Sequence, residues 1–95
     1  MLLKEFLKET LDGNEFLVRP AVICADGFLI SVQGSIYHYC EPQETIDTYE
    51  SLELSCESDS LLTDYQDECG ISGWVPVEIV EKLITKHGGI VEIKD

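Results

Sequence analysis

The residue types that most often carry chemistry in proteins are few in this chain. It has two histidines, His38 and His87, and four cysteines. Cys40 stands two residues after His38, so the two side chains would share one face of a strand. A thiol beside an imidazole could act as a nucleophile and its base, but that chemistry needs a third, orienting group. No such group and no nucleophile motif accompanies the pair, so the sequence predicts no catalytic site and a protein that is not an enzyme.

A zinc-stabilised adaptor is an alternative use of the same residues. The candidate ligands are Cys24, His38 and Cys40, with one of Cys56, Cys69 or His87. Structural zinc sites usually show a close ligand pair followed by a second pair, and a single His-x-Cys spacing matches only part of that pattern. We therefore expect His38, Tyr39 and Cys40 to pack or hydrogen-bond at the end of a sheet, with no metal and no other cofactor.

Acidic side chains are the most abundant chemical group. The 95 residues include 19 Asp and Glu against 6 Lys and Arg, which gives a formal net charge of -13. No lysine or arginine occurs between Arg19 and Lys82. Apolar residues are interspersed among the acids, so we expect this part to fold and to display its carboxylates outward. The candidate partner-binding residues are the acids of the densest part: Glu41, Glu44, Asp47, Glu50, Glu53, Glu57, Asp59, Asp64, Asp67 and Glu68.

The charge balance limits the kind of partner. Broad binding to nucleic acid neutralises phosphates with Lys and Arg, which this chain lacks, so direct nucleic-acid binding is excluded. An anionic membrane surface is disfavoured for the same reason. A protein with a basic nucleic-acid-binding groove suits the acids better, because spaced carboxylates resemble spaced phosphates electrostatically. The alternative is a solvated face that only keeps the protein soluble.

Both helices and strands are predicted to position these residues. Apolar spacing predicts a helix over residues 2–11, a short helix within 58–68 and a third over 77–86 that Gly88 and Gly89 end. Asp26-Gly27 between apolar runs predicts a hairpin with positive φ at both central residues. Further strands are expected over 48–55, 71–75 and 89–93, and Ser35 to Tyr39 extends or restarts a strand. The proline at Arg19-Pro20 predicts an edge or bulge.

Helices and strands that do not alternate regularly predict the α+β class. We expect a single domain over residues 1–95, with an antiparallel or mixed sheet. The charged residues Lys4, Glu5 and Lys8 interrupt the apolar pattern of the opening segment, unlike a signal peptide. A reducing cytosol and free cysteine thiols are therefore expected.

Two segments resemble a group of small uncharacterised proteins encoded by bacteriophages and prophages. They are Val18 to Cys40, VRPAVICADGFLISVQGSIYHYC, and Gly73 to Ile90, GWVPVEIVEKLITKHGGI. The resemblance brings no catalytic motif. It implies an accessory protein of viral origin in the host cytoplasm. Small acidic phage proteins are often inhibitors of host defence, including anti-restriction DNA mimics and anti-CRISPR proteins.

The leading hypothesis is therefore a non-enzymatic phage protein that inhibits a host defence complex through an acidic surface mimicking nucleic acid. The other hypothesis is a small structural or assembly module that self-associates through sheet edges and the apolar face of a helix, in which the acids serve solubility.

Overall fold

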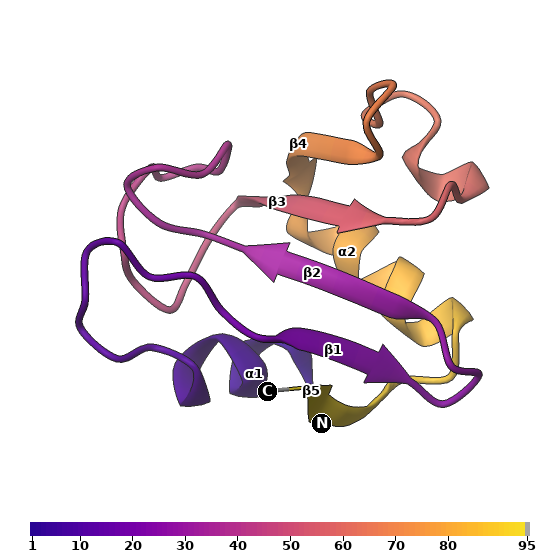
Figure 1. Ribbon diagram of the computed structural model, residues 1–95, viewed down its shortest axis with the longest axis horizontal. Coiled ribbons are helices and arrows are strands. Elements are labelled where there is room, and N and C mark those ends of the chain that lie inside the picture. Colours follow the sequence, from indigo (N-terminus) through magenta and orange to yellow (C-terminus); the bar gives the residue numbers. More distant parts are fainter. Residues whose placement is uncertain (95) are drawn as a thin grey trace.

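The computed structural model describes residues 1–94. It contains two α-helices, a short 3₁₀ helix and a five-stranded sheet (Figure 1). The elements are α1 (Leu3–Glu9), β1 (Ala21–Cys24), β2 (Leu29–Gln33), β3 (Ser51–Cys56), η1 (Ser60–Leu62), β4 (Ile71–Pro76), α2 (Val77–Lys86) and β5 (Ile90–Lys94). The strand order is β4-β3-β2-β1-β5, and every neighbouring pair is antiparallel. The predicted α+β class is confirmed.

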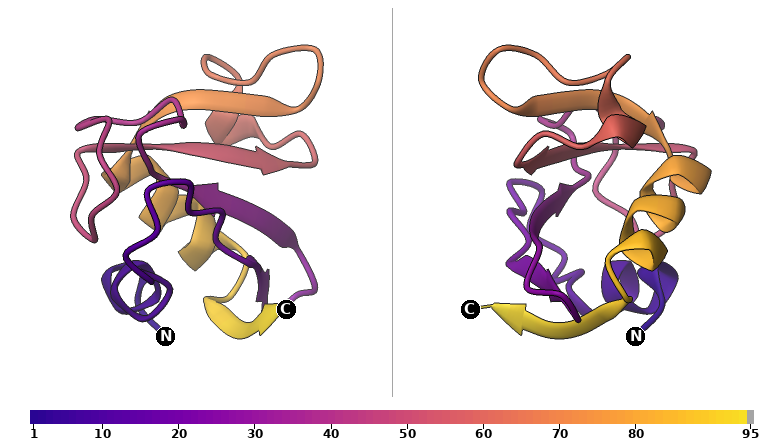
Figure 2. Two further views of the ribbon diagram at one scale, coloured as in Figure 1. Left: turned by 60° about the vertical axis from the view of Figure 1, so that its left-hand side comes forward. Right: turned by 90° about the vertical axis from the view of Figure 1, so that its right-hand side faces the viewer.

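Both helices lie against one face of the sheet, and α2 carries the chain from β4 at one edge to β5 at the other (Figure 2). Strand side chains alternate between two faces, so every second residue of an inner strand points to the helices. The fully buried side chains of Val22, Ile30 and Leu54 form this strand side of the core. Phe6 and Leu83 complete it from the helices. The opposite face of the sheet carries no helix.

The predicted hairpin forms between β1 and β2, but its turn differs from the predicted one. Gly27 has φ 91°, while Asp26 does not share its positive φ. The N–H of Gly27 donates to the carbonyl of Cys24 at 2.9 Å, and the Asp26 carboxylate accepts from the N–H of Phe28 at 2.9 Å. A turn closed in this way needs the left-handed conformation only at the glycine that follows it. The Asp26 side chain is 51% exposed.

Ser35 to Tyr39 does not form a strand, contrary to prediction. The Ser35 hydroxyl accepts from the N–H of Tyr37 at 3.1 Å and lies 2.6 Å from Nδ1 of His38. A serine side chain that bonds the backbone locally competes with strand pairing, and the chain turns instead. The other boundaries shift less. The first helix is shorter than 2–11, the middle helix is reduced to η1, and the strand expected over 48–55 begins at Ser51. No helix within residues 1–94 is long and apolar enough to cross a membrane.

Candidate functional site

His38 and Cys40 lie in the turn between β2 and β3 and do not form a reactive pair. Cys40 is 3% exposed, and its Sγ donates to the carbonyls of Ser35 and Pro42, each at 3.4 Å. Burial raises the pKa of the Cys40 thiol, which disfavours the nucleophilic thiolate. The imidazole of His38 is bonded to Ser35. Both side chains therefore hydrogen-bond at the end of the sheet, as predicted.

The candidate zinc ligands are separated in space. Cys24 ends β1 in the core and Cys40 lies beyond β2, while Cys56 ends β3. Burial, with Asp59 and Glu57 nearby, raises the pKa of Cys56 to about 11. Among residues 1–94, no group of three or more His, Cys, Asp or Glu side chains could hold a metal ion. The four cysteines are free thiols, as expected.

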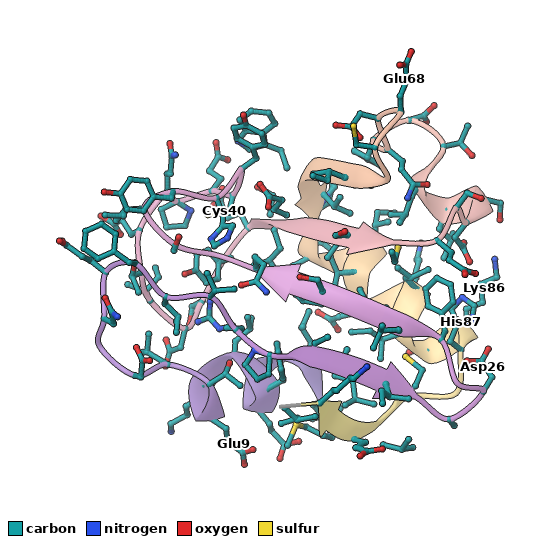
Figure 3. All side chains as sticks on the ribbon, in the orientation of Figure 1. Glu9, Asp26, Cys40, Glu68, Lys86 and His87 are labelled. Carbon is teal, nitrogen blue, oxygen red and sulfur yellow. The ribbon has the colours of Figure 1, made fainter. Side chains whose placement is uncertain are left out.

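The ten candidate acids fall into two groups at the two ends of β3. The first group lies in the loop that leads into β3, and the second lies in the segment between β3 and β4 (Figure 1). Glu53 stands between them within β3. Glu68 projects from the outermost part of the second segment, away from the sheet (Figure 3). The acids therefore form two charged ends and not one continuous face.

Three of the ten acids have roles within the fold. The Asp59 carboxylate accepts from the N–H of Leu61 at 3.0 Å, at the start of η1. Asp67 Oδ1 accepts from the N–H groups of Cys69 at 2.8 Å and Ile71 at 3.0 Å. Glu53 Oε1 accepts from the N–H of Tyr39 at 3.1 Å. These three carboxylates stabilise turns. The spacing of acids in the sequence did not distinguish them from the other seven.

Most of the acidic charge is not neutralised within the protein. Of the ten acids, only Asp59 forms an ion pair among the described residues. Six are exposed, and their carboxylates accept no hydrogen bond there: Glu41, Glu44, Glu50, Glu57, Asp64 and Glu68. A folded chain that leaves this charge uncompensated is destabilised by its own repulsion, and the same charge attracts cations and basic surfaces.

Arg19 does not offset this charge, because it is buried. It is the only lysine or arginine between Lys8 and Lys82, and it is 2% exposed. Its guanidinium donates to Thr10 Oγ1 at 2.9 Å and to the carbonyls of Gly34 at 2.6 Å and Ile46 at 2.8 Å. No carboxylate lies among these partners. Pro20 was predicted to place this part of the first strand at an edge or bulge, but β1 begins after it, at Ala21, and is an inner strand. The Arg19 side chain joins the end of α1 to two parts of the β2–β3 loop in the interior.

Exposed aromatic rings are the feature that sequence reasoning missed. Trp74 and Tyr39 stack with centroids 4.8 Å apart, and Phe16 and Tyr37 stack at 5.2 Å. All four are more than half exposed. Composition and spacing gave no reason to expect these rings on the surface, because aromatic side chains are highly buried on average. A signal was present at Gly73-Trp74, since a glycine within a strand often marks a bulge.

A cluster of charged side chains around His87 joins the β1–β2 turn to the end of α2. The ring of His87 lies between two carboxylates, with Nδ1 2.6 Å from Asp26 and Nε2 2.9 Å from Asp59 (Figure 3). Lys86 Nζ also contacts Asp59 at 2.9 Å, and Phe28 stacks on the imidazole at 3.8 Å. An ionised carboxylate only accepts hydrogen bonds, so the two contacts are both hydrogen bonds only when both ring nitrogens carry protons. The cluster leaves His87 no free nitrogen to act as a base.

The charges of this cluster shift each other's pKa. The hydrogen bonds to Asp26 and then to Asp59 raise the pKa of His87. Burial opposes ionisation of Asp59, but hydrogen bonds from Leu61, His87 and Lys86 lower its pKa to about 2. The stabilisation by His87 is therefore complete below its unfolded pKa of about 6.5 and is lost as the pH rises through the folded value. The stabilisation by Asp59 is present above its unfolded pKa and is lost as the pH falls toward 2.

We expect the protein to be more stable at about pH 6 than at about pH 8, because the unfolded chain loses the His87 proton in this range while the raised pKa favours the proton in the folded state. Replacing His87 with glutamine should lower the free energy of unfolding at the lower pH by about 1 kcal/mol and flatten the pH dependence. Urea denaturation at both pH values measures this. His38→Gln, which changes the other histidine, is the control and should keep the slope. A parent protein with equal stability at both pH values would contradict the prediction.

No protein-family model, curated protein or solved structure matches this chain.

Proposed function

We propose that this chain is a non-enzymatic binding protein whose acidic ends attach to the basic, nucleic-acid-binding surface of another protein. The observation that carries the proposal is the uncompensated charge: of the ten acids from Glu41 to Glu68, only Asp59 is ion-paired within residues 1–94. The one cation of the surrounding sequence, Arg19, is buried. Carboxylates without internal partners are available to steer and hold a basic surface.

The kind of partner follows from the resemblance to phage proteins. A phage accessory protein acts in the host cytoplasm, where the defence effectors that handle nucleic acid carry basic grooves. Occupying such a groove blocks nucleic acid by charge and needs no catalytic residue. The spacing of two acidic groups at the two ends of β3 fits an elongated groove, because each group contacts a different part of it. Inhibition of an anti-restriction or anti-CRISPR type is the expected consequence.

Charge reversal tests the proposal. One variant changes Glu41, Glu44 and Glu50 to lysine, and a second changes Glu57 and Glu68. We expect both to weaken capture of basic proteins from a bacterial lysate by about tenfold and to flatten the salt dependence of capture. The readout is quantitative mass spectrometry of proteins that immobilised protein retains at low salt and releases at high salt or on adding duplex DNA.

The matched control reverses three exposed acids elsewhere, at Glu78, Glu81 and Glu92. It makes the same change in net charge as the Glu41, Glu44 and Glu50 variant. If both variants captured fewer basic proteins, the loss would be an effect of overall charge alone. Retention of the same proteins by the parent and both test variants would refute the proposal.

Self-association is a second candidate, favoured by the apolar edge of the sheet. Within residues 1–94, β5 pairs only with β1, and Val91 on this edge is 64% exposed and lines a shallow hollow with Met1, which is 46% exposed. An open edge strand with apolar side chains is a template for pairing with a second copy. Light scattering of the parent separates the candidates. The binding proposal requires the 10.7 kDa monomer to remain competent for capture, whereas a stable oligomer that captures no partner favours self-association.

A further inference from the structure

A hollow of about 360 Å³ lies beside β4, the edge strand at the acidic side of the sheet. Its lining combines aromatic rings and carboxylates. The lining residues are Tyr39, Asp64, Tyr65, Asp67, Ile71, Gly73 and Trp74.

The aromatic wall depends on a bulge in β4. Leu52 pairs with Val75 and Leu54 pairs with Ser72, so that Gly73 and Trp74 both lie opposite Glu53. Bulges turn a side chain out of the regular strand direction. Trp74 has φ 49°, in the left-handed region, and its side chain is 56% exposed. A large exposed ring held in strained backbone gains little from the core, and such strain is typical of ligand-binding positions.

Tyr39 is fixed against Trp74 from the neighbouring turn. Its carbonyl accepts from the N–H of Trp74 at 2.9 Å, and its own N–H donates to Glu53 at 3.1 Å. The two rings stack at 4.8 Å with an interplanar angle of 23°. A Cβ at Gly73 would lie 3.1 Å from the Cβ of Tyr39, so the glycine leaves room for this approach. The aromatic wall is therefore preorganised.

The carboxylates of the hollow retain capacity to bind. Asp67 uses Oδ1 for the N–H groups of Cys69 and Ile71, and its Oδ2 accepts no hydrogen bond within residues 1–94. Asp64 is exposed and accepts none there either. A positive group in the hollow would meet these oxygens and the ring faces at once.

We propose that this hollow binds an arginine side chain of the protein partner. The inference rests on the proposed function and names the residue type that the partner supplies. A guanidinium is planar, stacks on aromatic rings and donates through a fork that matches a carboxylate. A lysine ammonium has the charge but neither the plane nor the fork. Tryptophan, tyrosine and arginine are also the residues that dominate binding energy at interfaces.

Trp74 reports occupancy directly, because it is the only tryptophan in the chain. The probes are three capped tripeptides, Gly-X-Gly, in which X is arginine, lysine or citrulline. Citrulline keeps the shape of arginine without its charge. We expect the arginine peptide to change Trp74 fluorescence saturably, with about threefold weaker binding of the lysine peptide and no response to citrulline. Equal responses to all three peptides, or no response to arginine, would overturn the inference.

Two variants locate the effect. Asp64→Asn and Tyr39→Leu should each weaken arginine-peptide binding by about fivefold. Glu78→Gln, an exposed carboxylate outside the hollow and outside the ten candidate acids, is the matched control and should bind like the parent. Parent-like binding by Asp64→Asn and Tyr39→Leu would also overturn the inference.

The two proposals fail separately. If lysine at Glu41, Glu44 and Glu50 weakens partner capture while the arginine peptide leaves Trp74 unchanged, only the arginine site is wrong. If the peptide binds as expected but charge reversal leaves capture unchanged, only the proposed function is wrong.

Discussion

Replacing Arg19 with methionine is expected to lower the free energy of unfolding by on the order of 3 kcal/mol. The substitution keeps an unbranched apolar stem but is shorter than arginine and removes all of its donors. The carbonyls of Gly34 and Ile46, which accept at 2.6 Å and 2.8 Å, would remain in place without their partner. A third carbonyl, that of Leu7, accepts at 3.3 Å. Each buried acceptor left unsatisfied costs about 1–3 kcal/mol, partly offset because a charge no longer has to be buried.

The loss is large compared with the stability of such a domain, which is usually about 5–15 kcal/mol. Urea denaturation followed by circular dichroism measures it. Arg19→Lys separates charge from geometry, because the ammonium retains the charge but lacks the fork that reaches the end of α1 and two parts of the β2–β3 loop. We expect the free energy of unfolding of Arg19→Lys to lie between those of the parent and Arg19→Met.

Lys82→Met is the surface control for the same experiment. Lys82 is exposed on α2 and forms no ion pair within residues 1–94, so its change should stay within about 0.5 kcal/mol. If Arg19→Met were as stable as Lys82→Met, the guanidinium would not be the anchor that its hydrogen bonds indicate.

Much of the fold could be predicted because apolar periodicity and end signals agree. The helix over 77–86 was predicted at the bounds it has, since Pro76 precedes it, Val80, Leu83 and Ile84 are buried on one face, and glycines follow. The prediction of a strand over Ser35 to Tyr39 was wrong, because a serine hydroxyl that bonds the local backbone leaves no trace in hydrophobic spacing.

The site was less predictable than the fold. Composition located the acids, but only tertiary contacts separate Asp59, which is paired with Lys86 and His87, from Glu68, which is not. The exposed stack of Tyr39 on Trp74 depends on a bulge and on a turn from another part of the chain. Burial of Arg19 likewise depends on carbonyls that come together only in the fold, although a lone cation in an acidic sequence was a usable signal.

Gly34→Ala is the second substitution with a large expected effect, because the position has no room for a methyl group. A Cβ there would lie 2.6 Å from Cζ of Tyr49 and 2.9 Å from both Cε atoms. Tyr49 is 6% exposed, and its hydroxyl donates to the carbonyl of Glu44 at 2.7 Å and accepts from the N–H of Ile46 at 3.0 Å. The ring cannot withdraw without breaking these bonds. We expect a loss of about 2–3 kcal/mol in the free energy of unfolding, at the upper end of ordinary overpacking.

A double-mutant cycle identifies the cause of that loss. Tyr49→Leu removes the distal ring atoms that the new methyl group would meet, at its own cost in stability. If the overlap with the ring is the cause, Gly34→Ala should cost less than about 1 kcal/mol in the Tyr49→Leu background, because the two changes are coupled through contact. An equal cost in both backgrounds would instead assign the effect to the Gly34 backbone, whose carbonyl also accepts from Arg19. In that case Arg19→Met and Gly34→Ala would be the coupled pair, and the loop from Glu41 to Glu50 would be held mainly by the guanidinium and not by the tyrosine ring.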